Sequence, residues 1–340
     1  MDAHLAALAY ALPERVVTND DLARDHADWD MARIGGKVGI TRRHVAAPDE
    51  TSADLAYAAG RKLLDGAGID PATIDCLLFC TQTPDHVLPT SACILQERLG
   101  LGTNVAAFDF NQGCSGYVYG LGIAKAFVAA GMARRVLFLT GETYSKLIHP
   151  RDRTVRVLFG DAGSASLIEA APGGARIGAV RLGSDGAGAQ NLIVQAGGFR
   201  RPRDAESAVE TTDEIGCTRT PEHLFMDGQA ITTFALQRVP ALVADTLADA
   251  GLAVDAIDHF VFHQANAFMN ERLRGRLKLP VEKVPSFLET VGNTVVNTIP
   301  IVLREAGPRF TAGQRVLAAG FGVGYSWGAA VLEWGDVRFA

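Results

Sequence analysis

The chain has 340 residues, of which 48% are hydrophobic and 21% charged, and its formal net charge at pH 7 is −6. This composition excludes a largely disordered chain, and the length exceeds what one hydrophobic core ordinarily serves, so we expect two domains or a duplicated core. The negative charge argues against a nucleic-acid-binding protein, which needs a basic surface.

The N-terminal segment MDAHLAALAYALPERVV has neither the basic start nor the long apolar core of a secretory signal. No run of about 18 uncharged apolar residues occurs, so we expect no transmembrane helix and no membrane partner. The 5 cysteines are odd in number and lie mostly in apolar segments, which is typical of reduced thiols in a cytoplasmic protein. No Cys or His set has zinc-site spacing, so we expect no metal.

Strand-like apolar runs alternate with helix-like periods along the chain, which predicts an α/β protein with a mostly parallel sheet covered by helices. The elements expected in the first half are helices over 50–67, 89–99 and 117–130 and strands over 74–81, 105–110, 135–140 and 165–169.

Cys114 lies where the strand over 105–110 ends, after the polar turn 111–113 and just before the helix over 117–130. A cysteine there lies near unpaired backbone N–H groups and the positive end of the helix dipole, and both favour thiolate over thiol. Thiolate attacks carbonyl carbon, so the position suits covalent acyl transfer. The alternative is a small core residue, and this stretch alone does not decide between the two.

The second half repeats the order of the first. AGIDPATIDCLLFCTQ (67–82) aligns with AGLAVDAIDHFVFHQA (250–265), NVAAFDFNQGC (104–114) with KVPSFLETVGN (283–293), and RRVLFLTG (134–141) with QRVLAAGF (314–321). Three blocks in one order indicate an internal duplication, with halves at 1–172 and 173–340 packed about a pseudo-twofold axis.

The duplication assigns Asn293 to the turn equivalent to that of Cys114, and His263 to the end of a strand equivalent to the one that ends near Cys80. We therefore predict that Cys114, His263 and Asn293 meet at one site. His263 would lie at a β-to-α turn, where sites are usually built, and Asn293 at a strand-to-helix turn. The alternatives are a histidine satisfied by hydrogen bonds and an asparagine that only shapes a turn.

Two further segments have more than one interpretation. The glycine-rich stretch GFGVGYSWG (320–328) allows close backbone approach and N–H groups directed at a ligand, as an oxyanion hole requires, but it also suits a bulge or hairpin. The polar segment 198–222 is either a solvated surface excursion or a loop that covers the active site or a dimer partner.

The chain as a whole resembles the thiolase-fold condensing enzymes, specifically the 3-oxoacyl-acyl-carrier-protein synthase III (KAS III) group. The similarity runs through LPERVVTNDDL, GITRRHVAAPDET, FDFNQGCSGYVYGL, DRTVRVLFGDAGSA, FHQAN, VGNT and GFGVGYSWG. It implies a thiolase-like fold, with two duplicated βα-rich halves in a layered αβαβα arrangement, and a homodimer. The family's Cys–His–Asn triad falls on Cys114, His263 and Asn293.

The reaction implied by this resemblance has two steps and needs no metal or redox cofactor. Cys114 takes an acyl group from acyl-CoA, while the backbone N–H groups of Cys114 and Val323 form the oxyanion hole. Malonyl-acyl carrier protein then enters, and His263 and Asn293 donate hydrogen bonds to its thioester oxygen. Carbon dioxide leaves, and the resulting enolate attacks the acyl-Cys carbonyl.

The resemblance also implies substrate contacts outside the triad. Trp29 and Arg153 would flank the adenine of CoA, and Lys37 would lie near its phosphates. Asn266 would lie near the thiol end of the pantetheine arm, and Phe321 is expected in the substrate site.

The chain departs from the family pattern at several positions. Leu88 stands where an aromatic residue often limits the acyl pocket of the neighbouring subunit, and Phe268 and Thr233 replace basic residues. The basic residues from Arg272 to Lys278 would dock an acidic carrier protein or form a solvated helix face.

Three other functions compete with condensation: transfer of the acyl group to an alcohol or amine, a silent partner subunit, and a cysteine hydrolase. The presence of Asn293 favours condensation over simple transfer, because transfer has less need of two enolate-stabilising donors. The complete triad argues against the silent subunit, and the duplication argues against the hydrolase.

Overall fold

The computed structural model describes all residues, 1–340. The α-helices are α1 (Asn19–Asp25), α2 (Met31–Val38), α3 (Ser52–Gly66), α4 (Ser91–Arg98), α5 (Gly116–Ala129), α6 (Arg153–Arg156), α7 (Gly228–Ala250), α8 (Ala267–Arg276) and α9 (Thr298–Ala306). The strands are β1 (His4–Ala11), β2 (Val16–Thr18), β3 (Arg42–His44), β4 (Cys76–Cys80), β5 (Ala106–Phe110), β6 (Arg135–Glu142), β7 (Ala162–Glu169), β8 (Ala175–Ser184), β9 (Leu192–Ile193), β10 (Thr211–Thr212), β11 (Thr218–Arg219), β12 (Phe225–Met226), β13 (His259–Phe262), β14 (Arg315–Gly322), β15 (Ser326–Glu333) and β16 (Arg338–Phe339).

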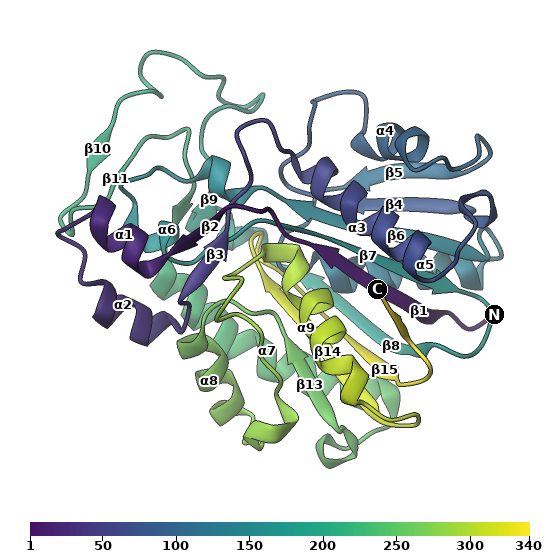
Figure 1. Cartoon of the computed structure of the whole chain (residues 1–340). Coiled ribbons are helices and arrows are strands. Elements are labelled where there is room, and N and C mark those ends of the chain that lie inside the picture. Colours follow the sequence, from purple (N-terminus) through teal and green to yellow (C-terminus); the bar gives the residue numbers. More distant parts are fainter.

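The main sheet has the strand order β13-β14-β15-β8-β1-β7-β6-β4-β5, and β16 pairs with β1 (Figure 1). β4 is parallel to β5 and β6, and β13 is parallel to β14. The pairs between these two ends, from β14 with β15 through to β7 with β6, are antiparallel. The prediction of a mostly parallel sheet is therefore wrong. One reason is that β14 and β15 are joined by a short hairpin turn, a connection that enforces antiparallel pairing.

The two ends of the sheet follow one plan. β1 is followed outward by β7, β6 and β4, and β8 is followed outward by β15, β14 and β13. The sequence alignment pairs β4 with β13 and β6 with β14, so the strand order agrees with it. β5 has no counterpart, because the segment 284–288 forms no strand. Pro285 in that segment has no N–H to donate to a ladder. The boundary between the halves at residues 172 and 173 stays a prediction.

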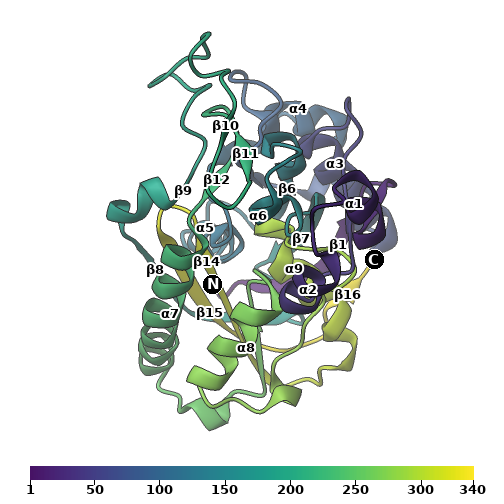
Figure 2. The ribbon, with the colours of Figure 1, turned by 90° about the vertical axis from the view of Figure 1, so that its left-hand side faces the viewer.

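Helices lie in layers around and between the two ends of the sheet. α3 packs on β7, β1 and β6, and α4 packs on β5 and β4. α7 packs on β15, β8 and β14, with α8 against it. Between these outer helices, α5 contacts strands of both halves, and so does α9. Figure 2 shows α5 and α9 in the centre, with α7 on one side and α3 on the other. The result is the expected succession of α, β, α, β and α layers.

The central helix α5 is buried because its sequence is apolar or small on nearly every side. Tyr117 and Leu121 belong to the same hydrophobic cluster as Phe138 of the first half and Val261 of the second. Gly120 is required here, since a Cβ atom at this position would lie 2.0 Å from the Phe138 ring. The helix that carries the Cys114 turn is therefore fixed by packing against both halves.

The other expected elements of the first half are confirmed, with ends that differ by a few residues. The helix expected over 50–67 is α3, which begins with a capping box between Thr51 and Asp54. The strand expected over 165–169 is β7 and begins earlier, at Ala162. The segment 198–222 contains only the small hairpin of β10 and β11, which lies near the top of the molecule in Figure 2.

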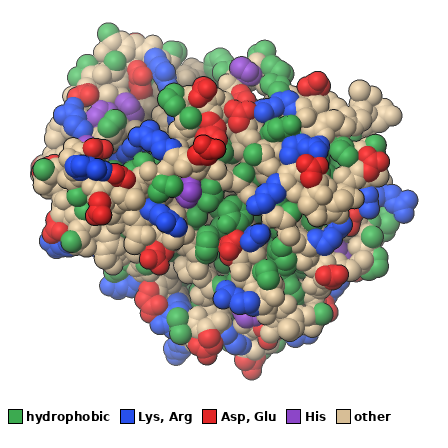
Figure 3. All heavy atoms as spheres, in the orientation of Figure 1, with side chains coloured by type: hydrophobic (Ala, Val, Ile, Leu, Met, Phe, Trp, Pro, Cys, Tyr) green, Lys and Arg blue, Asp and Glu red, His purple; other side chains and the backbone are tan.

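The helices of the structure are all too short or too polar to cross a membrane. No group of three or more His, Cys, Asp and Glu side chains is arranged to hold a metal ion. On the face drawn in Figure 3, basic, acidic and apolar side chains are interspersed, so this face has no large patch of one sign.

Candidate active site

Cys114 lies between β5 and α5 and is 6% exposed. It precedes Ser115, the N-cap residue of α5, whose hydroxyl lies 2.7 Å from the hydroxyl of Ser326 on β15. Strand β14 lies directly against Cys114. A Cβ atom at Gly322 would lie 2.9 Å from the Cys114 Sγ, and one at Gly320 would lie 2.5 Å from its carbonyl oxygen. The glycines of the 320–328 stretch therefore let two backbone segments approach each other at the sulfur.

The electrostatic setting of Cys114 differs from the expectation. Burial, with a smaller contribution from the negative charge of Glu142, raises the pKa of Cys114 to about 12. The backbone N–H groups of Cys114 and Val323 act in the opposite direction, and both lie close enough to the sulfur to stabilise its anion. The expected preference for thiolate is present in these N–H groups, but desolvation outweighs it, so the pKa of Cys114 is raised instead of lowered.

This shift has a pH-dependent consequence that alkylation can measure. Because the pKa is raised, the thiolate fraction at neutral pH is small and grows up to the pKa. We expect the rate of iodoacetamide labelling at Cys114 to rise about tenfold per pH unit from about pH 7 to 9. The rate constants come from mass spectrometry on Cys93→Ala protein, which lacks the exposed thiol of α4. A plateau in the rate below pH 9 would contradict the raised pKa.

His263 directly follows β13 and precedes α8, so the predicted β-to-α turn is confirmed. Its backbone N–H donates to Ala319 of β14 over 2.8 Å, and its ring lies edge-on to Phe321, with centroids 5.6 Å apart. Burial lowers the pKa of His263 to about 3, so the ring is neutral at physiological pH.

The tautomer of His263 depends on Thr298. Its Nδ1 lies 2.7 Å from the Thr298 hydroxyl, which also lies 3.0 Å from the Val295 carbonyl oxygen. When the hydroxyl donates to Val295, Nδ1 carries the hydrogen and Nε2 is an acceptor. When the hydroxyl donates to Nδ1, Nε2 carries the hydrogen and is a donor. The Thr298 hydroxyl can therefore pair with either tautomer by rotating, while the change of tautomer itself requires a proton to leave one ring nitrogen and another to bind the other.

Asn293 follows Gly292, whose φ of +74° is in the left-handed region that glycine favours. The prediction of a strand before this turn is wrong. Instead, the backbone of Asn293 is tied to the first half, donating to Leu158 over 2.8 Å and accepting from Gly160 over 3.1 Å. Its side-chain Oδ1 accepts the Val295 N–H over 2.9 Å. This bond orients the amide and leaves its NH2 group without a protein acceptor.

Cys114, His263 and Asn293 line one narrow cavity of about 60 Å³, as predicted from the repeat. Asn266 and Phe321 line it too, together with apolar side chains that include Ile231. The volume is about the share of two water molecules. A sulfur, an imidazole and a primary amide thus share a small, largely apolar space, in which electrostatic interactions are strong.

The other expected substrate residues lie outside this cavity. Trp29 is 5% exposed and stacks on His26 with ring centroids 4.0 Å apart, so one face of the indole is already covered. The ammonium group of Lys37 lies 5.3 Å from the ring centre of Phe268, the residue found in place of a basic one. Arg153 is the first residue of α6, and its guanidinium donates to the Ile215 carbonyl. Leu88 is 79% exposed, in the loop before α4.

Sequence reasoning missed two groups, one beside His263 and one that acts on Cys114. Thr298 carries no sequence signal, since its partner His263 lies 35 positions away in the chain. Glu142 ends β6 and is fully buried, accepting hydrogen bonds from the Gln82 N–H and the Thr83 hydroxyl, each over 3.0 Å. Burial holds the pKa of Glu142 well above its usual range. The sequence feature that could have identified Glu142 is a carboxylate at the end of the apolar run RVLFLTGE.

Comparison with known proteins gives consistent matches. Residues 108–186 match the family model of 3-oxoacyl-acyl-carrier-protein synthase III, and residues 247–334 match the model of its C-terminal part. A beta-ketoacyl-acyl-carrier-protein synthase III of Caldanaerobacter subterraneus subsp. tengcongensis is 37% identical over 325 residues, covering 95% of each chain. One from Streptomyces coelicolor is 38% identical over 334 residues, covering 97% of this chain and 96% of its own.

Solved structures agree with this result. A crystal structure of a 3-oxoacyl-(acyl-carrier-protein) synthase III superposes with a TM-score of 0.96 at 48% identity, covering 98% of this chain and all of the other. A 3-oxoacyl-(acyl-carrier protein) synthase of Burkholderia xenovorans superposes with a TM-score of 0.90 at 38% identity, covering 100% of this chain and 97% of its own. The expected thiolase-like fold is confirmed.

Proposed function

The chain belongs to the 3-oxoacyl-acyl-carrier-protein synthase III family, and we propose that it joins an acyl group from acyl-CoA to malonyl-acyl carrier protein with loss of carbon dioxide. The observation that carries this proposal is the orientation of Asn293. Its carbonyl oxygen is occupied by the Val295 N–H, so only the NH2 group is available to a molecule in the Cys114 cavity. A donor fixed in this way suits an oxygen that gains negative charge, as in an enolate.

In the first step, the Cys114 sulfur attacks the carbonyl carbon of acyl-CoA. His263 is neutral, so in the tautomer with hydrogen on Nδ1 its Nε2 accepts the thiol proton. That proton then passes to the departing CoA thiolate. The oxyanion of the tetrahedral intermediate is held by the N–H groups of Cys114 and Val323, which already favour negative charge at the sulfur. The products are acyl-Cys114 and free CoA.

In the second step, the thioester oxygen of malonyl-acyl carrier protein accepts hydrogen bonds from Asn293 and from Nε2 of His263 in its other tautomer. The bond to the malonyl carboxylate breaks, carbon dioxide leaves, and the electron pair forms an enolate. The enolate carbon attacks the acyl carbonyl, the bond to the Cys114 sulfur breaks, and the released thiolate takes up a proton from the solvent. Two neutral donors stabilise the enolate without binding the carboxylate more tightly in the ground state.

Transfer of the acyl group to an alcohol or amine is the second candidate, because Cys114 and its N–H groups would serve it equally well. Intact-mass analysis separates the two. The protein is incubated with acyl-CoAs of increasing chain length, and malonyl-acyl carrier protein is then added. Mass gain on Cys114 followed by carbon dioxide release supports condensation, whereas acylation without carbon dioxide release supports transfer. No mass gain with any acyl-CoA would overturn both.

We further propose a homodimer that forms along the β5 edge of the sheet. β5 is the last strand of the order, so one side of it has no neighbour, and Phe108 and Phe110 on it are only partly buried. Val87 and Leu88 nearby are 80% and 79% exposed, which is unusual for large apolar residues. Light scattering should give twice the mass of the chain, and a clean monomer would contradict the proposal. A cytoplasmic location and the absence of a resident cofactor stay predictions.

A further inference from the structure

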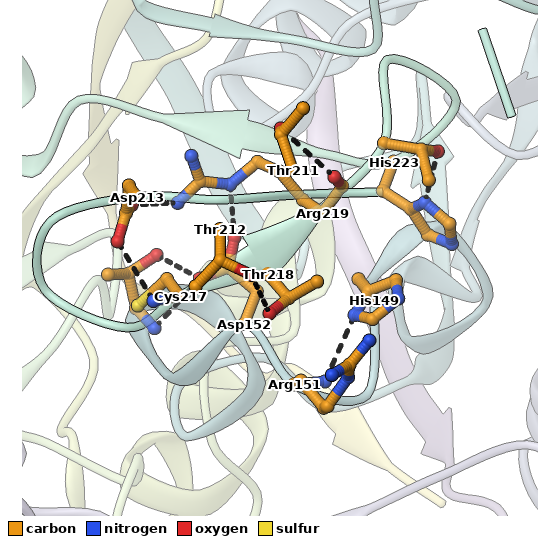
Figure 4. A network of polar contacts seen from close by, with 12 residues as sticks. His149, Arg151, Asp152, Thr211, Thr212, Asp213, Cys217, Thr218, Arg219 and His223 are labelled. Carbon is orange, nitrogen blue, oxygen red and sulfur yellow. Dashed lines mark hydrogen bonds and ion pairs between the residues drawn. The ribbon is translucent and has the colours of Figure 1, made fainter. Parts of the chain in front are cut away.

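The segment 198–222 carries a small hairpin that packs on the loop before α6. The hairpin consists of β10 and β11, each two residues long, which are too short to be stable by themselves. Figure 4 shows that it lies against the segment from His149 to Asp152 through polar groups. The Thr218 N–H donates to the Arg151 carbonyl over 3.3 Å, and Glu210 pairs with both His149 and Arg151.

Arg219 is the central side chain of this attachment. Its Nε donates to Asp152 over 2.7 Å, and one terminal nitrogen donates to Asp213 over 2.9 Å. Asp213 in turn accepts the Cys217 N–H over 2.8 Å, which closes the hairpin turn. Arg219 thus joins the turn of the hairpin to the protein body.

The ion pair between Arg219 and Asp152 matters because Asp152 is buried and caps a helix. It is 1% exposed, and it is the N-cap of α6, where one carboxylate oxygen accepts the Thr154 N–H over 3.0 Å. The other oxygen is paired with Arg219, the one cation that forms an ion pair with it. A buried carboxylate that loses its cation is costly, so without Arg219 the cap of this four-residue helix should change its position.

Two contacts fix the position of Arg153, one through its backbone and one through its side chain. It follows Asp152 directly as the first residue of α6, and its guanidinium donates to the Ile215 carbonyl at the tip of the hairpin. The backbone beneath Arg153 therefore depends on the Asp152 cap, and its side chain depends on the hairpin. Arg219 supports both.

We propose that Arg219 is a positioning residue that holds Arg153 for the nucleotide part of the acyl-CoA donor. The inference rests on the proposed function, in which acyl-CoA is the donor, and on the contact between Arg153 and the adenine that the family resemblance implies. It also assigns a role to the segment 198–222, whose hairpin carries Arg219 and contacts Arg153 through the Ile215 carbonyl.

The test compares two acyl donors that differ only in the nucleotide. Acylation of Cys114 is followed by mass spectrometry with acetyl-CoA and with acetyl-pantetheine, for the wild type and Arg219→Met. We expect the half-saturating concentration of acetyl-CoA to rise about tenfold, the effect of one charge-assisted hydrogen bond, with the maximal rate changed less than about threefold. The rate with acetyl-pantetheine should not change, and Arg219→Lys should restore part of the affinity for acetyl-CoA.

Arg203→Met is the matched control, because Arg203 lies in the same segment but is paired with Glu222 and is 70% exposed in its side chain. It should bind acetyl-CoA like the wild type. Equal losses with both donors in Arg219→Met would show a general structural role and overturn the proposal, as would no loss with either. An additional loss in Arg219→Met combined with Arg153→Ala, beyond Arg153→Ala alone, would show that Arg219 does not act through Arg153. Failure of the wild type to be acylated would instead count against the proposed function.

Discussion

Cys114→Ala is expected to lose acylation completely and to lower the rate of condensation by at least about 10⁴-fold, as removal of a covalent nucleophile does in other enzymes. Alanine keeps the Cβ atom and the carbonyl oxygen of residue 114 that Gly322 and Gly320 approach, so the fold should persist. Intact mass after incubation with acyl-CoA measures the first effect, and formation of 3-oxoacyl product from acyl-CoA and malonyl-acyl carrier protein measures the second.

The same variant should retain slow decarboxylation of malonyl-acyl carrier protein. The donors proposed for that step are His263 and Asn293, and neither is hydrogen-bonded to the Cys114 side chain. Cys93→Ala is the matched control, since it removes the exposed thiol of α4 and should leave both half-reactions intact. Condensation by Cys114→Ala at the wild-type rate would exclude Cys114 as the nucleophile.

The parts of the fold that could be predicted from the sequence are those set by local pattern. α5 follows from an unbroken run of apolar and small residues, and its burial between two layers follows from the absence of a polar face. The meeting of Cys114, His263 and Asn293 follows from the repeat, because equivalent turns of two similar halves face one another. These features depend on residue type and order alone.

The features that were missed depend on three-dimensional surroundings. The absence of a strand over 284–288 reflects a proline and a lack of paired neighbours, whereas the aligned strand over 105–110 pairs with β4. The raised pKa of Cys114 comes from burial by segments distant in sequence, which outweighs a helix end that can be recognised locally. Thr298 and Arg219 each act through one hydrogen bond to a residue distant in the chain, and the periodicity of a sequence does not indicate such bonds.

In the proposed mechanism Asn293 acts in only one of the two half-reactions, which makes its role testable by itself. Acylation would use Cys114, the N–H groups of Cys114 and Val323, and the acceptor form of His263. Decarboxylation would use the donor form of His263 and the NH2 group of Asn293. A change at Asn293 should therefore affect the second step alone, whereas a general distortion of the cavity would affect both.

Asn293→Asp is expected to slow decarboxylation of malonyl-acyl carrier protein by at least about 10²- to 10³-fold, the loss typical of one oxyanion donor. Aspartate keeps an oxygen that can accept the Val295 N–H, so the turn is preserved. It replaces the NH2 group with an oxygen that cannot donate when ionised and that repels the developing enolate. Acylation of Cys114 should stay within about threefold of the wild type, because Asn293 takes no part in that step.

Asn293→Ala separates the lost donor from the added charge. Alanine removes the NH2 group without adding a charge, so Asn293→Ala should slow decarboxylation less than Asn293→Asp if charge repulsion contributes. Alanine also removes the acceptor for the Val295 N–H, so the melting temperature of Asn293→Ala should fall below that of Asn293→Asp. Carbon dioxide release and intact-mass acylation are measured on both variants. Equal losses in acylation and decarboxylation would show that Asn293 only shapes the turn. Unimpaired decarboxylation in Asn293→Asp would show that Asn293 does not stabilise the enolate, and His263 would then be the one side-chain donor proposed there.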